Sequence, residues 1–365
     1  MNFFWYHDRI IQQYLRAKFK NPTITEHEFG SSSYQKLHQI NCCFSSRPWG
    51  MLHDISNHVP HPFNIVTKNP YCYSKQNKNF GEICMDTAAK IADITDRPIA
   101  VTWSGGIDST AALAALMQTV ELSRITVVCN NISIDEFPSF YENKIKNRVN
   151  VISLTQWCDR YDDFFSVSGD GGDTVWATID ESFWTNNQHK IHLPWQDCID
   201  RTIIDDIDFV ENFCSWSSVE IKSWLDLRTW FYLCCKWQDK CMRPYYLRQD
   251  VTNKDTVAFY DLDTSFQNWT MNNLDNIIGT TWQDYKIPAK KFIHQYHQDS
   301  DYLKNKSKVN SFSIDLDLNS KYQTHTRIAV SENFSGPRLP SWPFIDYAEI
   351  EDFNDMDELI PRDII

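Results

Sequence analysis

The sequence predicts an α/β fold in which helices flank a parallel sheet, followed by a largely helical C-terminal half. Short apolar segments alternate with helical patterns between residues 79 and 173, and this alternation is typical of parallel sheets. Two of the strand-like segments run directly into turns rich in glycine and aspartate. Beyond Asp173 the chain changes to long helical segments dense in Trp and Cys, such as residues 217–243.

The expected elements follow one another in a regular order. Residues 82–95 place apolar side chains at helical spacing, and the sequence Asp-Arg-Pro closes this pattern. A second helix is expected over residues 109–118. Strands are expected within residues 99–103, 125–131, 149–154 and 163–169. Strands connected through helices in this way pair in parallel.

The chain divides into three regions. Residues 1–78 contain a helical pattern over residues 7–19 and then a mixed polar stretch, to which we assign no fold. Residues 79–312 carry the predicted sheet and the helices that follow it. Residues 313–365 have the composition of a loop-rich, acidic tail.

Charge and composition restrict the class of partner. Lys and Arg number 35 against 48 Asp and Glu, a net charge of -13, and no long basic run is present, so nucleic acid is a disfavoured partner. No apolar run approaches the roughly 18 residues needed to span a bilayer, and we find no secretory signal. The 11 cysteines are scattered and form no C-x-x-C motif. We therefore expect a cytoplasmic protein that acts on small molecules and does not enter the membrane.

The first glycine turn, SGGIDS at residues 104–109, lies between a predicted strand and a predicted helix. A helix N-terminus after such a turn presents unpaired N–H groups and the positive end of the helix dipole, which together bind anions. Gly105 and Gly106 would let the backbone approach a phosphate group. Ser104 and Ser109 offer hydroxyl donors, and Asp108 can hold Mg²⁺. The turn is therefore expected to bind phosphate.

This S-G-G-x-D-S pattern resembles the PP-loop of the ATP pyrophosphatase superfamily, which cleaves ATP between the α and β phosphates and releases pyrophosphate. It differs from the Walker P-loop because no G-K-[ST] follows. The resemblance implies an adenine nucleotide alpha hydrolase-like PP-loop fold, with ATP and Mg²⁺ as cofactors. By the same resemblance, Thr102, Val128 and Cys129 would line the adenine.

The second turn, SGDGGD at residues 168–173, also follows an apolar segment. We expect both turns at one edge of the sheet, where open α/β sheets bind ligands. The turn resembles the S-G-[ED]-G-[AG]-D segment of the asparagine synthetase family, in the amide-forming branch of the superfamily. The resemblance covers about residues 80–312. It implies that Asp173 joins Asp108 in ligating Mg²⁺ and that Ser168 and Gly169 lie beside the adenosine.

One later segment carries weaker similarity to the family, and another departs from it. The segment YLKNKSKVNSF at residues 302–312 resembles the family's P-K-Q-G-F segment, whose lysine faces the phosphates and would stabilise charge on pyrophosphate. Lys308 is expected in this role, with Lys306 as the alternative. Near DTVAFYDLD, Thr256 stands where the family has a glutamate. Asp255 or Asp261 is therefore expected to substitute as general base.

The resemblance implies an ATP-dependent carbon–nitrogen ligase. Such an enzyme adenylates a carboxylate and transfers the acyl group to ammonia or an amine, releasing AMP and pyrophosphate. Full asparagine synthetases begin with a catalytic Cys at position 2, where this chain has Asn2, so we expect no glutaminase of that kind. Two alternatives remain open: a PP-loop enzyme that modifies a nucleobase or tRNA, and an ATP-binding protein that no longer catalyses.

Overall fold

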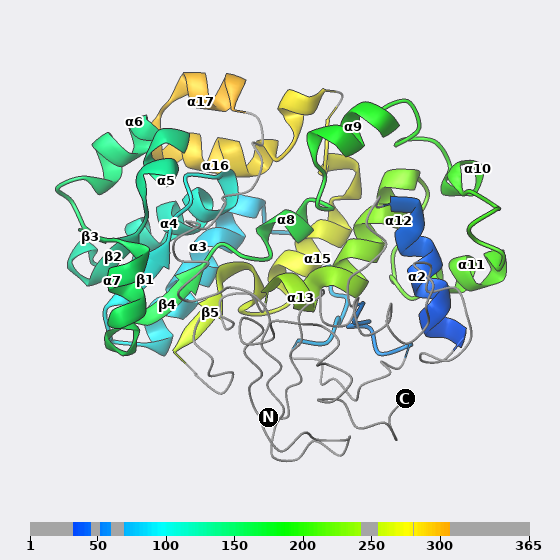
Figure 1. Ribbon diagram of the computed structural model, residues 1–365, viewed down its shortest axis with the longest axis horizontal. Helices are drawn as coiled ribbons and strands as arrows, with labels where there is room; N and C mark the ends of the chain where they lie inside the picture. Colours follow the sequence, from blue (N-terminus) through cyan, green and yellow to red (C-terminus); the bar gives the residue numbers. More distant parts are fainter. Residues whose placement is uncertain (1–31, 45–51, 60–68, 242–254, 280, 307–365) are drawn as a thin grey trace, which may run out of the picture.

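The computed structural model describes residues 32–44, 52–59, 69–241, 255–279 and 281–306 (Figure 1). The expected helix over residues 7–19, Asn2, Lys308 and the tail over 313–365 lie outside these ranges. Five parallel strands form one sheet in the order β3-β2-β1-β4-β5, so the predicted α/β fold with a parallel sheet is confirmed. The strands are β1 (Ile99–Thr102), β2 (Ile125–Val128), β3 (Asn150–Ile152), β4 (Phe165–Ser168) and β5 (Thr256–Ala258).

Helices account for most of the remaining described chain. None of them has the length and apolar character needed to cross a membrane, as far as the described residues go. The longer ones are α2 (Ser32–Phe44), α3 (Phe80–Ile94), α4 (Ile107–Thr119), α11 (Ile207–Ser215), α12 (Trp224–Phe231), α15 (Ser265–Asn272) and α16 (Ile287–His297). The shorter ones are α5 (Asn131–Glu136), α6 (Pro138–Phe140), α7 (Leu154–Asp159), α8 (Gly172–Val175), α9 (Glu181–Asn187), α10 (Trp195–Cys198), α13 (Trp237–Cys241) and α17 (Ser300–Asn305).

Apolar side chains bury both faces of the sheet. Val101 pairs in register with Val127 on one side and Val167 on the other, and all three are buried in the main core with α3 and α4. Ala100 and Val128 point to the opposite face and pack in a second cluster with Trp157 of α7. Because side chains alternate along a strand, near-continuous apolar strands are expected in a sheet that is covered on both faces.

The strand order places the two glycine turns side by side. The chain passes from β1 through β2 to β3 on one side and then returns to lay β4 against the other side of β1. The carboxyl ends of β1 and β4 are therefore neighbours at the point where the strand order reverses. Open α/β sheets bind ligands at such a switch point.

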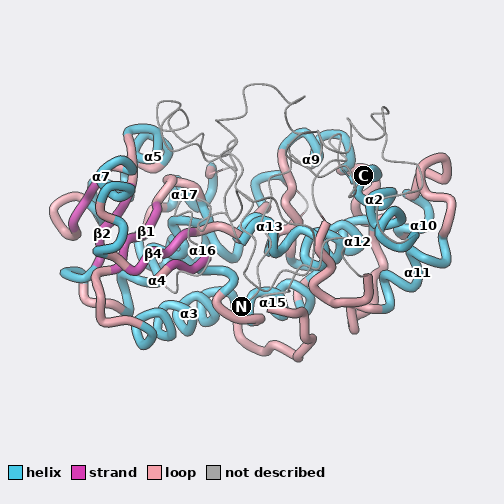
Figure 2. Tube along the Cα trace, turned by 60° about the horizontal axis from the view of Figure 1, so that its bottom comes forward, coloured by secondary structure: helices cyan, strands magenta, loops and turns pink. Residues whose placement is uncertain are grey.

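The described N-terminal residues share the core of the rest of the chain. Leu37 and Ile40 of α2 are fully buried in the main hydrophobic cluster, and α2 packs against α11 and α12. Figure 2 shows the strands with α3, α4 and α7 toward one end of the molecule and α2 with α9–α12 toward the other. A π-helical stretch, Tyr232–Lys236, joins α12 to α13, so the helical character expected over residues 217–243 is confirmed for 224–241. Residues 217–223 are not helical, and residues 242 and 243 lie outside the described ranges.

Candidate functional site

The first glycine turn connects β1 to α4. Gly105 has φ +76°, and a Cβ atom there would lie 2.3 Å from the carbonyl oxygen of Ser133, so only glycine fits this position. The Ser104 and Ser109 hydroxyls lie 2.9 Å apart, and the Ser104 N–H donates to Ser109 Oγ. No side chain caps α4 at Gly106. Backbone N–H groups in the first turn of α4 are therefore available to an anion.

The second glycine turn connects β4 to α8 and lies directly against the first. A Cβ atom on Gly169 would come within 2.8 Å of Ser109 Cα, and one on Gly172 within 2.6 Å of Asp108 Cβ. Both positions require glycine because the opposing turn occupies that space. The two turns thus meet at the edge of the sheet, as their positions after β1 and β4 predict.

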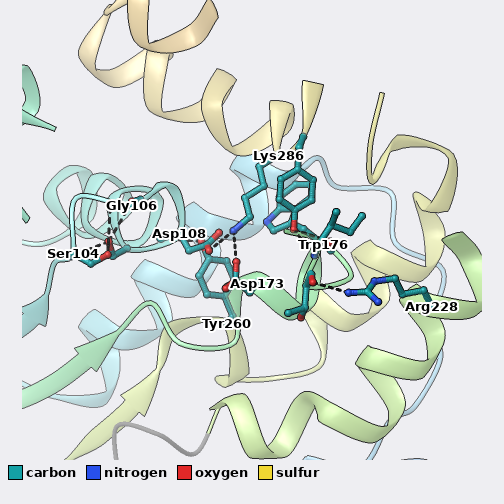
Figure 3. A network of polar contacts seen from close by, with 12 residues as sticks. Ser104, Gly106, Asp108, Asp173, Trp176, Arg228, Tyr260 and Lys286 are labelled. Carbon is teal, nitrogen blue, oxygen red and sulfur yellow. Dashed lines mark hydrogen bonds and ion pairs between the residues drawn. The ribbon is translucent and has the colours of Figure 1, made fainter. Parts of the chain in front are cut away.

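A buried lysine joins the two turns (Figure 3). The Lys286 ammonium donates to Asp108 Oδ2 and, at 2.7 Å, to Asp173 Oδ1, while its side chain is 2% exposed. Burial alone would lower the pKa of Lys286, but the carboxylates of Asp108 and Asp173 outweigh it and raise the pKa. Lys286 therefore stays charged at every physiological pH.

Sequence reasoning missed Lys286. Pro288 in the first turn of α16 is a recognisable sign of a helix start. Nothing in the local sequence pairs the preceding lysine with aspartates 178 and 113 positions away in the chain. The contact follows from the way α16 packs on α3 and α4, which brings the start of α16 to the turns.

The residues that flank β5 are Tyr260, which reaches the site, and Asp255 and Asp261, the two expected bases, which do not. The Tyr260 hydroxyl donates to the carbonyl oxygen of Asp108 at 3.0 Å. Asp261 accepts instead from Trp237 Nε1 at 2.7 Å and from the Asn69 side chain at 3.1 Å. The Asp261 carboxylate is thus used to join α13 and residue 69 to the chain after β5.

Asp255 lies at the opposite edge of the sheet. It immediately precedes β5, its carbonyl accepts from Ser166 N–H, and its carboxylate pairs with Arg97, which precedes β1. Parallel strands begin at one edge and end at the other, so Asp255 stands a full strand length from the glycine turns. Thr256 is buried within β5. The structure therefore does not bring Asp255 to the site.

Lys306 approaches the first turn indirectly. Its ammonium pairs with the carboxylate of Glu136, at the end of α5. A Cβ on Gly105 would lie 2.7 Å from Glu136 Cβ, so this ion pair borders the first turn.

The residues expected beside the adenine lie at adjacent strand ends. Thr102 ends β1 and pairs in register with Val128, which ends β2, and Cys129 follows. Ser168 ends β4 on the other side of Thr102. Burial raises the pKa of Cys129 to about 11, so its thiol stays neutral. Val128, Cys129 and Ser168 are buried, and Thr102 is partly exposed.

The donor set fits ATP with Mg²⁺. An uncapped helix N-terminus, a glycine turn and serine hydroxyls suit the phosphates. Asp108 and Asp173 suit Mg²⁺, which typically takes one or two carboxylates together with substrate phosphates and water. Within the described ranges no three His, Cys, Asp or Glu side chains gather as a metal site of their own, so the phosphates would have to complete the coordination.

Comparisons of this chain with protein-family models, with curated proteins and with solved structures find no match.

Proposed function

We propose that this protein is an ATP-dependent ligase that adenylates a carboxylate and transfers the acyl group to ammonia or an amine, forming an amide, AMP and pyrophosphate. The observation that carries the proposal is the contact between the two glycine turns, with Lys286 bridging Asp108 and Asp173 between them. The resemblance of both turns to the PP-loop and to the asparagine synthetase segment supports it further.

The residues have distinct roles in this proposal. The first turn of α4 and the hydroxyls of Ser104 and Ser109 hold the phosphates. Lys286 neutralises charge that develops on the leaving pyrophosphate, because its ammonium stays protonated beside the turns. When bound to Asp108 and Asp173, Mg²⁺ would supply further charge neutralisation. The protein thus acts mainly by positioning and electrostatics.

The amine nucleophile must lose a proton, and neither Asp255 nor Asp261 faces the turns. Asp170 is the remaining carboxylate of the second turn. Its backbone N–H donates to Ser168 Oγ, and its side chain is partly exposed. It therefore replaces those two residues as the proposed proton acceptor.

One observation favours a second candidate function, an ATP-binding protein that does not catalyse. Lys286 contacts both carboxylates that would ligate the metal. If this lysine replaces Mg²⁺ permanently, ATP would bind and remain intact. Measurement of ATP consumption separates the two functions.

The proposal predicts that Asp108→Asn and Asp173→Asn each lower ATP consumption by about 100-fold or more, because each removes a charge from the phosphate site. The matched control is Asp255→Asn, which changes a carboxylate at the other edge of the same sheet and should retain the wild-type rate. Consumption is measured with Mg²⁺, ammonium and a deproteinised metabolite extract as the source of carboxylate. Equal rates in wild type and Asp108→Asn would contradict the proposal, and ATP that binds without being consumed would favour the second candidate.

A further inference from the structure

The backbone that follows α8 is held by side chains from distant parts of the chain. Four successive carbonyls, residues 175–178, each accept a hydrogen bond from such a side chain. The donors are Thr270 Oγ1 to Val175 at 3.2 Å, Tyr285 Oη to Trp176 at 2.9 Å, Arg228 Nε to Ala177 at 3.1 Å and Arg228 Nη2 to Thr178 at 2.9 Å. Val175 is the last residue of α8 and the other three residues follow it, so these carbonyls receive their hydrogen bonds from α12, α15 and the residue before Lys286.

This segment adopts a strained conformation. Ala177 has φ 59° and Thr178 has φ 49°, two consecutive non-glycine residues in the left-handed region. The Thr178 N–H donates to the carbonyl oxygen of Asp173 at 2.8 Å, so the strained turn closes directly onto the residue that pairs with Lys286. A conformation of this kind persists only where surrounding contacts enforce it.

Arg228 is the main source of those contacts. It is 2% exposed, and its guanidinium lies 3.7 Å from the ring centre of Phe183 and 4.4 Å from that of Tyr232. Its remaining hydrogen bond goes to the carbonyl of Phe44 at 3.0 Å, and no carboxylate in the described part of the chain pairs with it. The rigid fork of guanidinium donors suits two adjacent carbonyls, which a lysine cannot engage in the same way.

Tyr285 connects this segment to Lys286. The Tyr285 hydroxyl donates to the Trp176 carbonyl and accepts the Ile179 N–H at 3.1 Å. The next residue, Lys286, pairs with Asp173. Two consecutive residues therefore hold the start and the end of the segment 173–179. Figure 3 shows Lys286 beside Asp173, with Trp176 and Arg228 nearby.

We infer that Arg228 and Tyr285 are positioning residues, which hold the turn after α8 so that the Asp173 carboxylate meets Lys286 and the phosphate site. The inference that they serve catalysis rests on the proposed function. The positioning of Asp173 against Lys286 is a property of the protein without nucleotide and can be measured separately.

The first test uses the protein labelled with ¹⁵N-lysine and no nucleotide. The ammonium signal of Lys286, identified by its loss in Lys286→Met, should shift or broaden in Arg228→Gln and in Tyr285→Phe. Arg228→Lys retains a donor and should show a smaller change. Matched controls are Arg124→Gln, an arginine that donates to the carbonyls of Thr95 and Arg97, and Tyr71→Phe, whose hydroxyl donates to Ser217. Neither control should move the signal.

The second test measures ATP affinity by calorimetry, in EDTA and in Mg²⁺. In EDTA, Arg228→Gln should bind ATP within about twofold of the wild-type affinity. In Mg²⁺ it should bind ATP about tenfold more weakly than the wild type, a loss typical of substitutions in residues that support a metal site. Arg228→Lys should recover part of that loss. If Arg228 only stabilised the fold, its substitution would lower the melting temperature and leave the difference in ATP affinity between Mg²⁺ and EDTA unchanged.

The two tests separate the two claims. An unchanged Lys286 signal in folded Arg228→Gln, or in Tyr285→Phe if the arginine variant does not fold, overturns the positioning role. A signal that moves while even the wild type binds no ATP supports the positioning role and contradicts the proposed function.

Discussion

Gly106 tests the phosphate site at the scale of a single residue. An added Cβ would meet only Ser104 Oγ, at 3.2 Å, and Gly106 has φ −72°, which alanine adopts readily. We therefore expect Gly106→Ala to fold with nearly wild-type stability but to bind ATP about tenfold more weakly, because a methyl group at the N-cap of α4 would hinder the approach of a phosphate to the backbone. Calorimetry and thermal unfolding measure both effects, and equal ATP affinity would mean that the turn is structural only.

The residues of the site divide into those that local sequence predicts and those that it does not. Gly105 and Gly171 lie at positive φ in turns that the glycine pattern marks clearly. Lys286 and Arg228 carry no such mark, because their roles depend on helices packed from far along the chain. The expectation for Asp255 and Asp261 rests on aligning DTVAFYDLD with a family segment from which it departs, and such an alignment does not determine the edge or the face of the sheet on which a carboxylate lies.

At the scale of elements, we expect the stability of the corner between α16 and α17 to depend on pH. Asp299 caps α17 and accepts from Ser139 Oγ at 2.6 Å, and the same hydroxyl lies 3.2 Å from His297 Nε2. Burial alone would raise the pKa of Asp299, but hydrogen bonds from Ser139 and Tyr302, together with His297, outweigh it and lower the pKa. For His297, whose side chain is 4% exposed, burial lowers the pKa because it disfavours the charged imidazolium.

Both groups bind fewer protons when folded than when unfolded, so both stabilise the fold less as pH falls. As the pH falls, the loss of stability due to His297 begins near its ordinary pKa of 6.5, and the loss due to Asp299 begins near its ordinary pKa of 3.8. We predict that His297→Gln reduces the loss of unfolding free energy between pH 7 and pH 5. The control His189→Gln, at an exposed position, should leave that loss unchanged. Denaturant unfolding at pH 7 and pH 5 measures this loss of unfolding free energy. An equal loss in wild type and His297→Gln would contradict the role assigned to His297.

Strands and helices differ in how well their patterns predict them. The helix expected over residues 82–95 is α3, Phe80–Ile94, because its capping box and apolar spacing are local signals. β5 was not expected, since three residues between polar neighbours carry too little periodicity, and the strand forms through pairing with β4. Short strands of this kind depend on tertiary contacts.

At the scale of the whole molecule, the alternation of strands and helices predicts the parallel sheet, and the position of both turns after strands predicts that they share an edge. The N-terminal region could not be assigned, because the helix α2 finds its apolar partners in α11 and α12, more than 160 residues later in the chain. The expected boundary at residue 78 accordingly falls within one continuous core.

The bond at which ATP is cut tests the central claim most directly. The purified chain is incubated with ATP labelled in the α phosphate, Mg²⁺, ammonium and the deproteinised metabolite extract, and Asp108→Asn reports any contaminating activity. A site that stabilises leaving pyrophosphate through Lys286, Asp108 and Asp173 should yield labelled AMP together with pyrophosphate. Labelled ADP with orthophosphate as the main products of the wild type, absent from Asp108→Asn, would contradict the account.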